Sequence, residues 1–142
     1  MAIRTATGIW QGDLKGGSGT VGVGSGLFDG AAYTFASRFE EAGGTNPDEL
    51  LGAALASCFS MFFAAQLASA GFTATSVHTD AKVHLGKDDI GPAVTRIELA
   101  CRAEVPGIDA EKFAELAQVS KEGCPISKAL ASTPIELDAR QV

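Results

Sequence analysis

The longest apolar run in the chain, residues 50–70, predicts a helix that is buried on all sides. It contains no charged side chain, and its polar side chains are three serines and one glutamine. Asn46 suits the N-cap, Pro47 the first helical position and Gly71 the C-terminal cap. At 1.5 Å per residue this helix is roughly 35 Å long. One small domain rarely encloses a helix of that length on all sides. The pattern therefore also predicts a second subunit that packs on the same helix.

The same run is long enough to cross a lipid bilayer, and its flanks decide between the two interpretations. Its start carries Asp48 and Glu49, no Lys or Arg stands close to either end, and neither Trp nor Tyr lies nearby. Membrane spans are typically flanked by cationic and aromatic residues. The run is also rich in Ala and Ser rather than in Leu, Ile and Val. We therefore favour a core helix over a membrane span.

Alternating apolar and polar positions predict strands elsewhere in the chain. The expected elements are strands at residues 5–14, 19–24, 31–40, 72–85, 93–105 and 133–139, and further helices at residues 109–122 and 124–132. The order is β-β-β-α-β-β-α-α-β, without regular βαβ alternation. This order predicts an α+β fold with a largely antiparallel sheet, in a single domain of residues 1–142.

Composition and charge exclude several classes of function. The net charge of the 142-residue chain is -6, and its Lys and Arg residues form no cluster longer than a pair, so nucleic acid is not an expected partner. His78 and His84 fall on the polar face of their predicted strand, at no zinc-ligand spacing from a cysteine, so no metal site is predicted. The first residues lack the apolar core of a signal peptide, so we expect a cytoplasmic protein.

The three cysteines have three different predicted environments. Cys101 lies on the apolar face of its strand and is predicted to be a packing residue. Cys124 precedes Pro125 at the predicted N-cap of a short helix, where free N–H groups and the helix dipole favour a thiolate. A turn cysteine without chemistry is the alternative there. An odd number of cysteines does not suggest a disulfide-stapled secreted scaffold.

Cys58 lies in the middle of the long apolar helix, where burial alone would make a thiol inert. Its chemistry therefore depends on whether a cation is brought to it. Arg38, on the predicted third strand, is the best candidate. A buried arginine needs a carboxylate partner, which Glu49 could supply in addition to a capping-box role at the start of the helix.

The motifs "SRFE", "GTNPDELLGAALASCFSM", "AGF", "VPGID" and "GCPISKAL" occur in an order that resembles the OsmC/Ohr family of organic hydroperoxide reductases. The resemblance is closer to the OsmC branch and covers nearly the whole chain. It implies an OsmC-like fold, in which two long central helices pack in an intertwined homodimer. By motif, Cys58 matches the peroxidatic cysteine and Cys124 the resolving cysteine. Arg38 matches the arginine that activates the thiolate, and Glu49 the carboxylate that holds this arginine.

The resemblance implies a peroxidase of oxidative and osmotic stress defence that needs no metal, flavin or other cofactor. Cys58 would attack an organic hydroperoxide, and a Cys58–Cys124 disulfide would then be reduced by an external dithiol of the lipoyl type. Apolar side chains near the predicted site suit an organic tail, namely Leu55, Met61, Phe62 and Phe35. The alternatives are a thiol redox sensor that forms the same disulfide without turnover, and a dimer that binds an apolar ligand.

Overall fold

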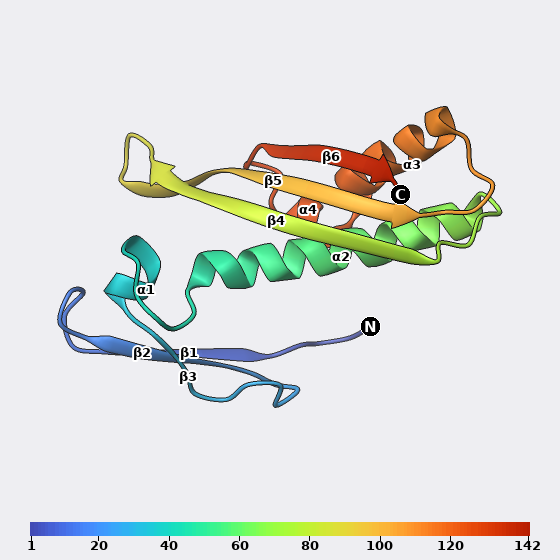
Figure 1. Ribbon diagram of the computed structural model, residues 1–142. Helices are drawn as coiled ribbons and strands as arrows, with labels where there is room; N and C mark the ends of the chain where they lie inside the picture. Colours follow the sequence, from blue (N-terminus) through green and yellow to red (C-terminus); the bar gives the residue numbers. More distant parts are fainter. The chain divides into compact units, whose positions relative to one another are not determined.

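The computed structural model describes residues 1–142, which form two compact units, residues 1–50 and residues 51–142 (Figure 1). The first unit contains a three-stranded antiparallel sheet in the order β1-β2-β3. Its elements are β1 (Ala6–Gln11), β2 (Ser18–Val23), β3 (Ala31–Tyr33), the short helix α1 (Phe35–Phe39) and the first turn of α2 (Pro47–Ser69). That the whole chain is one domain stays a prediction.

The second unit contains most of α2 and a second three-stranded sheet in the order β4-β5-β6. Its further elements are β4 (Ser76–Lys87), β5 (Pro92–Glu104), α3 (Ala110–Gly123), α4 (Pro125–Ala129) and β6 (Ile135–Gln141). β4 and β5 are antiparallel, whereas β5 and β6 are parallel. The predicted α+β class with largely antiparallel pairing is confirmed.

The predicted ends of the long helix are confirmed. At its start, the side-chain oxygen of Asn46 accepts a hydrogen bond from the N–H of Glu49 at 2.8 Å, as expected of an N-cap. At its end, Gly71 has a φ of +91°, and the N–H of Phe72 donates to the carbonyl of Leu67 at 2.9 Å. A glycine with positive φ, followed by a hydrogen bond from the next N–H back to the last helical turn, is the usual C-terminal cap of a helix.

One stripe of α2 forms the core of the second unit. Its fully buried residues recur every four positions, as the period of a helix requires: Leu55, Phe59, Phe63 and Leu67. They belong to one cluster with the inward side chains of β5, which are Ile97, Leu99, Cys101 and Ala103. The apolar run that could have crossed a membrane is thus the helix on which this core is built.

The expectation that α2 is buried on all sides is not met within one chain. The opposite face of the helix stays exposed, and Met61 on it is 74% exposed. The other exposed positions on α2 beyond its first turn are Ala53, Ala54, Ser57, Ala65, Ala68 and Ser69. Apart from the two serines these are apolar side chains, so the face is available to a partner.

The predicted strand at residues 31–40 is wrong after Tyr33, because the chain turns into α1 instead. Thr34 and Ser37 form a reciprocal capping box: the N–H of Ser37 donates to Thr34 Oγ1 at 3.0 Å, and the N–H of Thr34 donates to Ser37 Oγ at 2.8 Å. These local bonds stabilise a helix start over an extended chain. Arg38 therefore lies on a helix, and its predicted position on a strand face is wrong.

The remaining predicted elements are confirmed with small shifts at their ends. Asp109 caps α3 through a 2.8 Å bond from the N–H of Lys112, and the predicted inner face of that helix is buried. The polar positions of β4 and β5 bear side chains that interact with one another: His84 contacts Glu98, and His78 contacts Asp80. The nearby His84 side chain is the main cause of a lowered pKa at Glu98.

Candidate functional site

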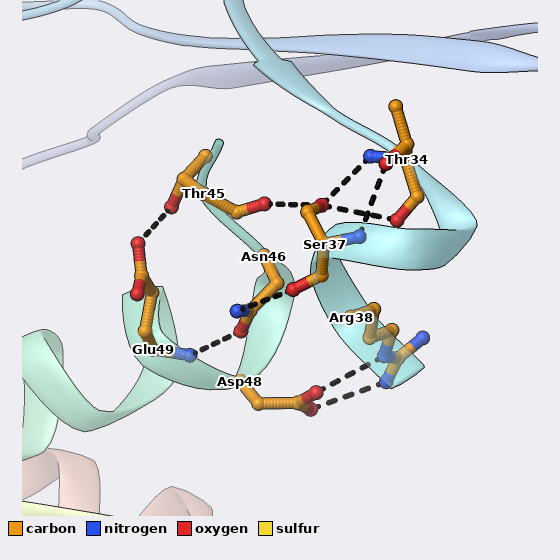
Figure 2. A network of polar contacts seen from close by, with 7 residues as sticks. All are labelled: Thr34, Ser37, Arg38, Thr45, Asn46, Asp48 and Glu49. Carbon is orange, nitrogen blue, oxygen red and sulfur yellow. Dashed lines mark hydrogen bonds and ion pairs between the residues drawn. The ribbon is translucent and has the colours of Figure 1, made fainter. Parts of the chain in front are cut away.

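In the first unit, Arg38 forms a bidentate ion pair with Asp48. Arg38 Nε lies 3.1 Å from Asp48 Oδ2, and Nη2 lies 3.2 Å from Oδ1, so two parallel hydrogen bonds join the two planar groups (Figure 2). The Asp48 side chain is only 11% exposed, and that of Arg38 is 35% exposed. This arrangement fixes the orientation of a guanidinium and leaves part of it accessible.

Glu49 is not the partner of Arg38, contrary to the prediction. Its carboxylate accepts a hydrogen bond from the Thr45 hydroxyl at 2.6 Å, and its own N–H donates to Asn46 (Figure 2). Successive helical residues point about 100° apart, so Asp48 and Glu49 face different sides of the helix start. The sequence offered two adjacent carboxylates, and only the position of α1 selects Asp48.

Ser37 connects α1 to the start of α2 (Figure 2). Its hydroxyl lies 2.8 Å from the carbonyl oxygen of Thr45, and its own carbonyl accepts a hydrogen bond from the Asn46 side-chain amide at 3.1 Å. Ser37 is 6% exposed, so these bonds do not compete with bulk water. Ser37, the residue before Arg38, is thus bonded directly to Thr45 and Asn46, which lie three and two residues before Asp48. The T-x-x-S pattern of Thr34 and Ser37 is a sequence signal for the start of α1, but it does not predict the bonds from Ser37 to Thr45 and Asn46.

In the second unit, the structure brings Cys58 on α2 close to Cys124 at the start of α4. Both thiols are free. Burial raises the pKa of the Cys58 thiol, the backbone N–H of Ile126 opposes this shift, and the Cys124 side chain raises the pKa further. Cys124 therefore lies near enough to influence the titration of Cys58. Within this unit these surroundings favour the neutral thiol, and a nearby cation would favour the thiolate at Cys58.

Cys124 is fully buried and, as predicted, caps α4. The N–H of Ser127 donates to Cys124 Sγ at 3.4 Å, and the Ser127 hydroxyl lies 3.0 Å from the same sulfur. The preceding residue, Gly123, leaves room for the ring of Phe62: a Cβ at this position would lie 3.0 Å from a ring carbon. Phe62, four residues after Cys58, therefore packs beside the cysteine turn.

The third thiol, Cys101, is a packing residue, as its place on the apolar face of β5 predicts. It is fully buried, and burial is the main cause of its raised pKa. No group of three or more His, Cys, Asp or Glu side chains is placed to hold a metal ion.

The four residues predicted to contact substrate lie in different surroundings. Leu55 is fully buried in the core, so its prediction as part of an apolar substrate wall is wrong: its side chain reaches no surface. Phe62 is partly buried and Met61 is exposed on α2. Phe35, in the first unit, packs against Phe39 with ring centroids 4.8 Å apart.

Comparison with known proteins gives the family. The model of the OsmC-like protein family matches residues 40–138, which include Cys58 and Cys124. The chain is 50% identical over 121 residues to a peroxiredoxin OsmC from Escherichia coli, a match that covers 85% of each protein. The chain belongs to the OsmC family. A peroxiredoxin OsmC from Shigella flexneri is similar to the same extent.

Solved structures of OsmC-like proteins share the fold. An OsmC-like protein of unknown function from Vibrio cholerae is similar over 99% of this chain and 100% of its own, with a TM-score of 0.77 at 18% identity. The organic hydroperoxide resistance protein OhrB of Bacillus subtilis is similar over 96% of this chain and 98% of its own, with a TM-score of 0.71 at 23% identity. These likenesses confirm the predicted OsmC-like fold.

Proposed function

We propose that this OsmC family member is a cysteine-based peroxidase that reduces organic hydroperoxides to alcohols. The observation that carries the proposal is the proximity of two free thiols, Cys58 and Cys124, from segments far apart in the sequence. Membership of a family with a peroxiredoxin at 50% identity supports the same activity. A second thiol at this place is what a two-step peroxidase needs, because the first oxidation product must be resolved.

In the proposed reaction, the Cys58 thiolate attacks the outer oxygen of the hydroperoxide ROOH. The O–O bond breaks, the departing alkoxide takes a proton and leaves as ROH, and Cys58 becomes a sulfenic acid. The Cys124 thiol then attacks the Cys58 sulfur, which releases water and leaves a Cys58–Cys124 disulfide. An external dithiol reduces this disulfide by thiol–disulfide exchange and restores both thiols.

Arg38 is proposed to supply the cation that Cys58 lacks within its own unit. A guanidinium beside a thiol favours the thiolate, and it also stabilises the negative charge on the leaving oxygen. The bidentate bond to Asp48 supports this role, because it holds the guanidinium in one orientation. The carboxylate of Glu49, expected from the sequence to hold Arg38, accepts a hydrogen bond from the Thr45 hydroxyl instead, at the start of α2.

The proposed substrate is a hydroperoxide with an apolar tail rather than hydrogen peroxide. Phe62, Met61 and Phe35 are the apolar side chains that we propose for contact with this tail. The proposed reductant is a lipoyl-type dithiol, and the proposed compartment is the cytoplasm. A steady-state assay with cumene hydroperoxide and dihydrolipoamide tests this function, and a disulfide that forms without continued turnover would instead favour a redox sensor.

Cys124→Ser is expected to stop the reaction after one turnover. The first step needs only Cys58, so reduced protein should still consume about one equivalent of cumene hydroperoxide in a burst. Without a resolving thiol, the sulfenic acid should persist and go on to sulfinic acid, which intact-mass measurements detect as two added oxygens. Normal cycling of this variant with dihydrolipoamide would show that Cys124 is not the resolving residue.

We also propose that two copies of the chain form a homodimer through the exposed apolar face of α2. An apolar face of this kind is costly to leave in water, and a second copy would cover it. Sedimentation velocity is expected to give a mass of about twice 14.5 kDa at micromolar concentration. A monomer at that concentration would rule out the dimer.

A further inference from the structure

We propose that Ser37 is a positioning residue that sets the geometry of the Arg38–Asp48 pair, an inference that rests on the proposed role of Arg38 in Cys58 oxidation. Ser37 directly precedes Arg38 on α1, and Thr45 and Asn46 directly precede the helix turn that carries Asp48. Figure 2 shows that the polar groups of Ser37 point toward these two residues and toward Thr34.

The hydroxyl group of Ser37 joins two backbone segments. It accepts a hydrogen bond from the N–H of Thr34 at 2.8 Å and can donate to the carbonyl of Thr45 at the same distance. The Thr34 carbonyl, at 3.0 Å, is a second acceptor in reach of the same proton. A serine hydroxyl has one donor and two acceptor sites, so its single proton and one of its acceptor sites are engaged by the protein.

The backbone of Ser37 makes the second connection. Its carbonyl accepts from Asn46 Nδ2 at 3.1 Å, while Oδ1 of the same amide accepts from the N–H of Glu49 at 2.8 Å. The Asn46 side chain therefore bonds α1 with one end and the first turn of α2 with the other. Because Asp48 lies in that turn, the bond fixes the carboxylate relative to α1.

The Arg38–Asp48 pair depends on such support. The Arg38 side chain is 35% exposed, and ion pairs with this access to water contribute little on their own. A bidentate pair also tolerates little displacement, because two bonds must stay parallel. The chain between the two partners includes the exposed residues 40–44, with Gly44 at a φ of +104°, so chain connectivity alone does not hold them in register. The two connections through Ser37 bridge this loop.

A role limited to capping α1 would use only the bonds between Ser37 and Thr34. Two variants separate capping from positioning. Ser37→Ala removes the hydroxyl and all its bonds. Asn46→Asp keeps a side-chain oxygen that caps α2 equally well, and it leaves the α1 capping box intact. It loses only the N–H donor to the Ser37 carbonyl. If Ser37 positions the pair, both variants should impair the same reaction step.

The test measures the rate of Cys58 oxidation by cumene hydroperoxide in a single turnover of the reduced full-length protein. Ser37→Ala and Asn46→Asp are each expected to slow this step by about tenfold, because small displacements of a charged group near reacting atoms are costly. Arg38→Met is expected to slow it further. In the Arg38→Met background, neither change should slow the step again, since both act through Arg38. Ser25→Ala, in an exposed turn of the same unit, is the matched control and should stay within about twofold.

The possible outcomes distinguish this inference from the proposed function. If Arg38→Met oxidises as fast as the wild type, the role of Arg38 is wrong and the inference falls with it. If Arg38→Met is slow but Ser37→Ala and Asn46→Asp stay within twofold, only the positioning role is overturned. An additional loss in the Arg38→Met background would show that Ser37 acts on general stability instead. Should Ser37→Ala fail to fold, Asn46→Asp alone decides in the same way.

Discussion

Cys58→Ser is expected to abolish turnover of cumene hydroperoxide, with a loss of at least about 1,000-fold in kcat/KM. A serine hydroxyl does not ionise near neutral pH, and its oxygen is a far poorer nucleophile toward a peroxide than a thiolate. The measurement is consumption of cumene hydroperoxide with dihydrolipoamide as reductant. The same variant should form no intramolecular disulfide on peroxide treatment, as judged by thiol counting.

Cys101→Ala is the matched control for Cys58→Ser. It also removes one thiol from the second unit, but that thiol is a fully buried packing group on β5. The variant should therefore retain kcat/KM within about twofold, with a loss of stability of about 1 kcal/mol from the small cavity. Full turnover by Cys58→Ser, or loss of turnover in Cys101→Ala at unchanged folding, would contradict the assignment of Cys58 as the peroxidatic residue.

Asp48→Asn is expected to lower kcat/KM by roughly 10- to 100-fold. Asparagine has nearly the same shape, but it offers only one acceptor and no charge, so the bidentate bond to Arg38 is lost. Arg38 should then occupy several orientations and stabilise the Cys58 thiolate less. The rate of Cys58 alkylation by iodoacetamide as a function of pH should report a midpoint shifted to higher pH.

Glu49→Gln is the matched comparison, since it changes the neighbouring carboxylate in the same helix turn. Glutamine can still accept the Thr45 hydroxyl bond, and the N–H of Glu49 that Asn46 caps is unaffected. The loss of kcat/KM in Glu49→Gln should therefore be much smaller than the loss in Asp48→Asn. A larger loss for Glu49→Gln would restore Glu49 as the residue that holds Arg38, as the sequence had predicted.

Local sequence patterns were sufficient for most of the fold. The caps Asn46, Gly71 and Asp109 act through bonds to backbone groups three to five residues away, so their effect is encoded within one turn of chain. The apolar faces of β4, β5 and α3 follow directly from periods of 2 and 3.6. The strand predicted at residues 31–40 is wrong after Tyr33 because the Thr34–Ser37 capping box, an equally local feature, starts a helix there.

The sequence by itself determined the long apolar helix, the packing role of Cys101, the cap position of Cys124 and the family to which the chain belongs. Tertiary structure alone decided which groups meet. It paired Arg38 with Asp48 rather than Glu49, placed Cys58 near Cys124, and buried Leu55 out of reach of a substrate. The physical reason is that caps and periodicity act over a few residues, whereas these contacts depend on the angle and depth at which separate elements pack. Adjacent residues on a helix point about 100° apart, so Asp48 and Glu49 face different neighbours. A pattern of residue types does not say which of the two directions faces Arg38.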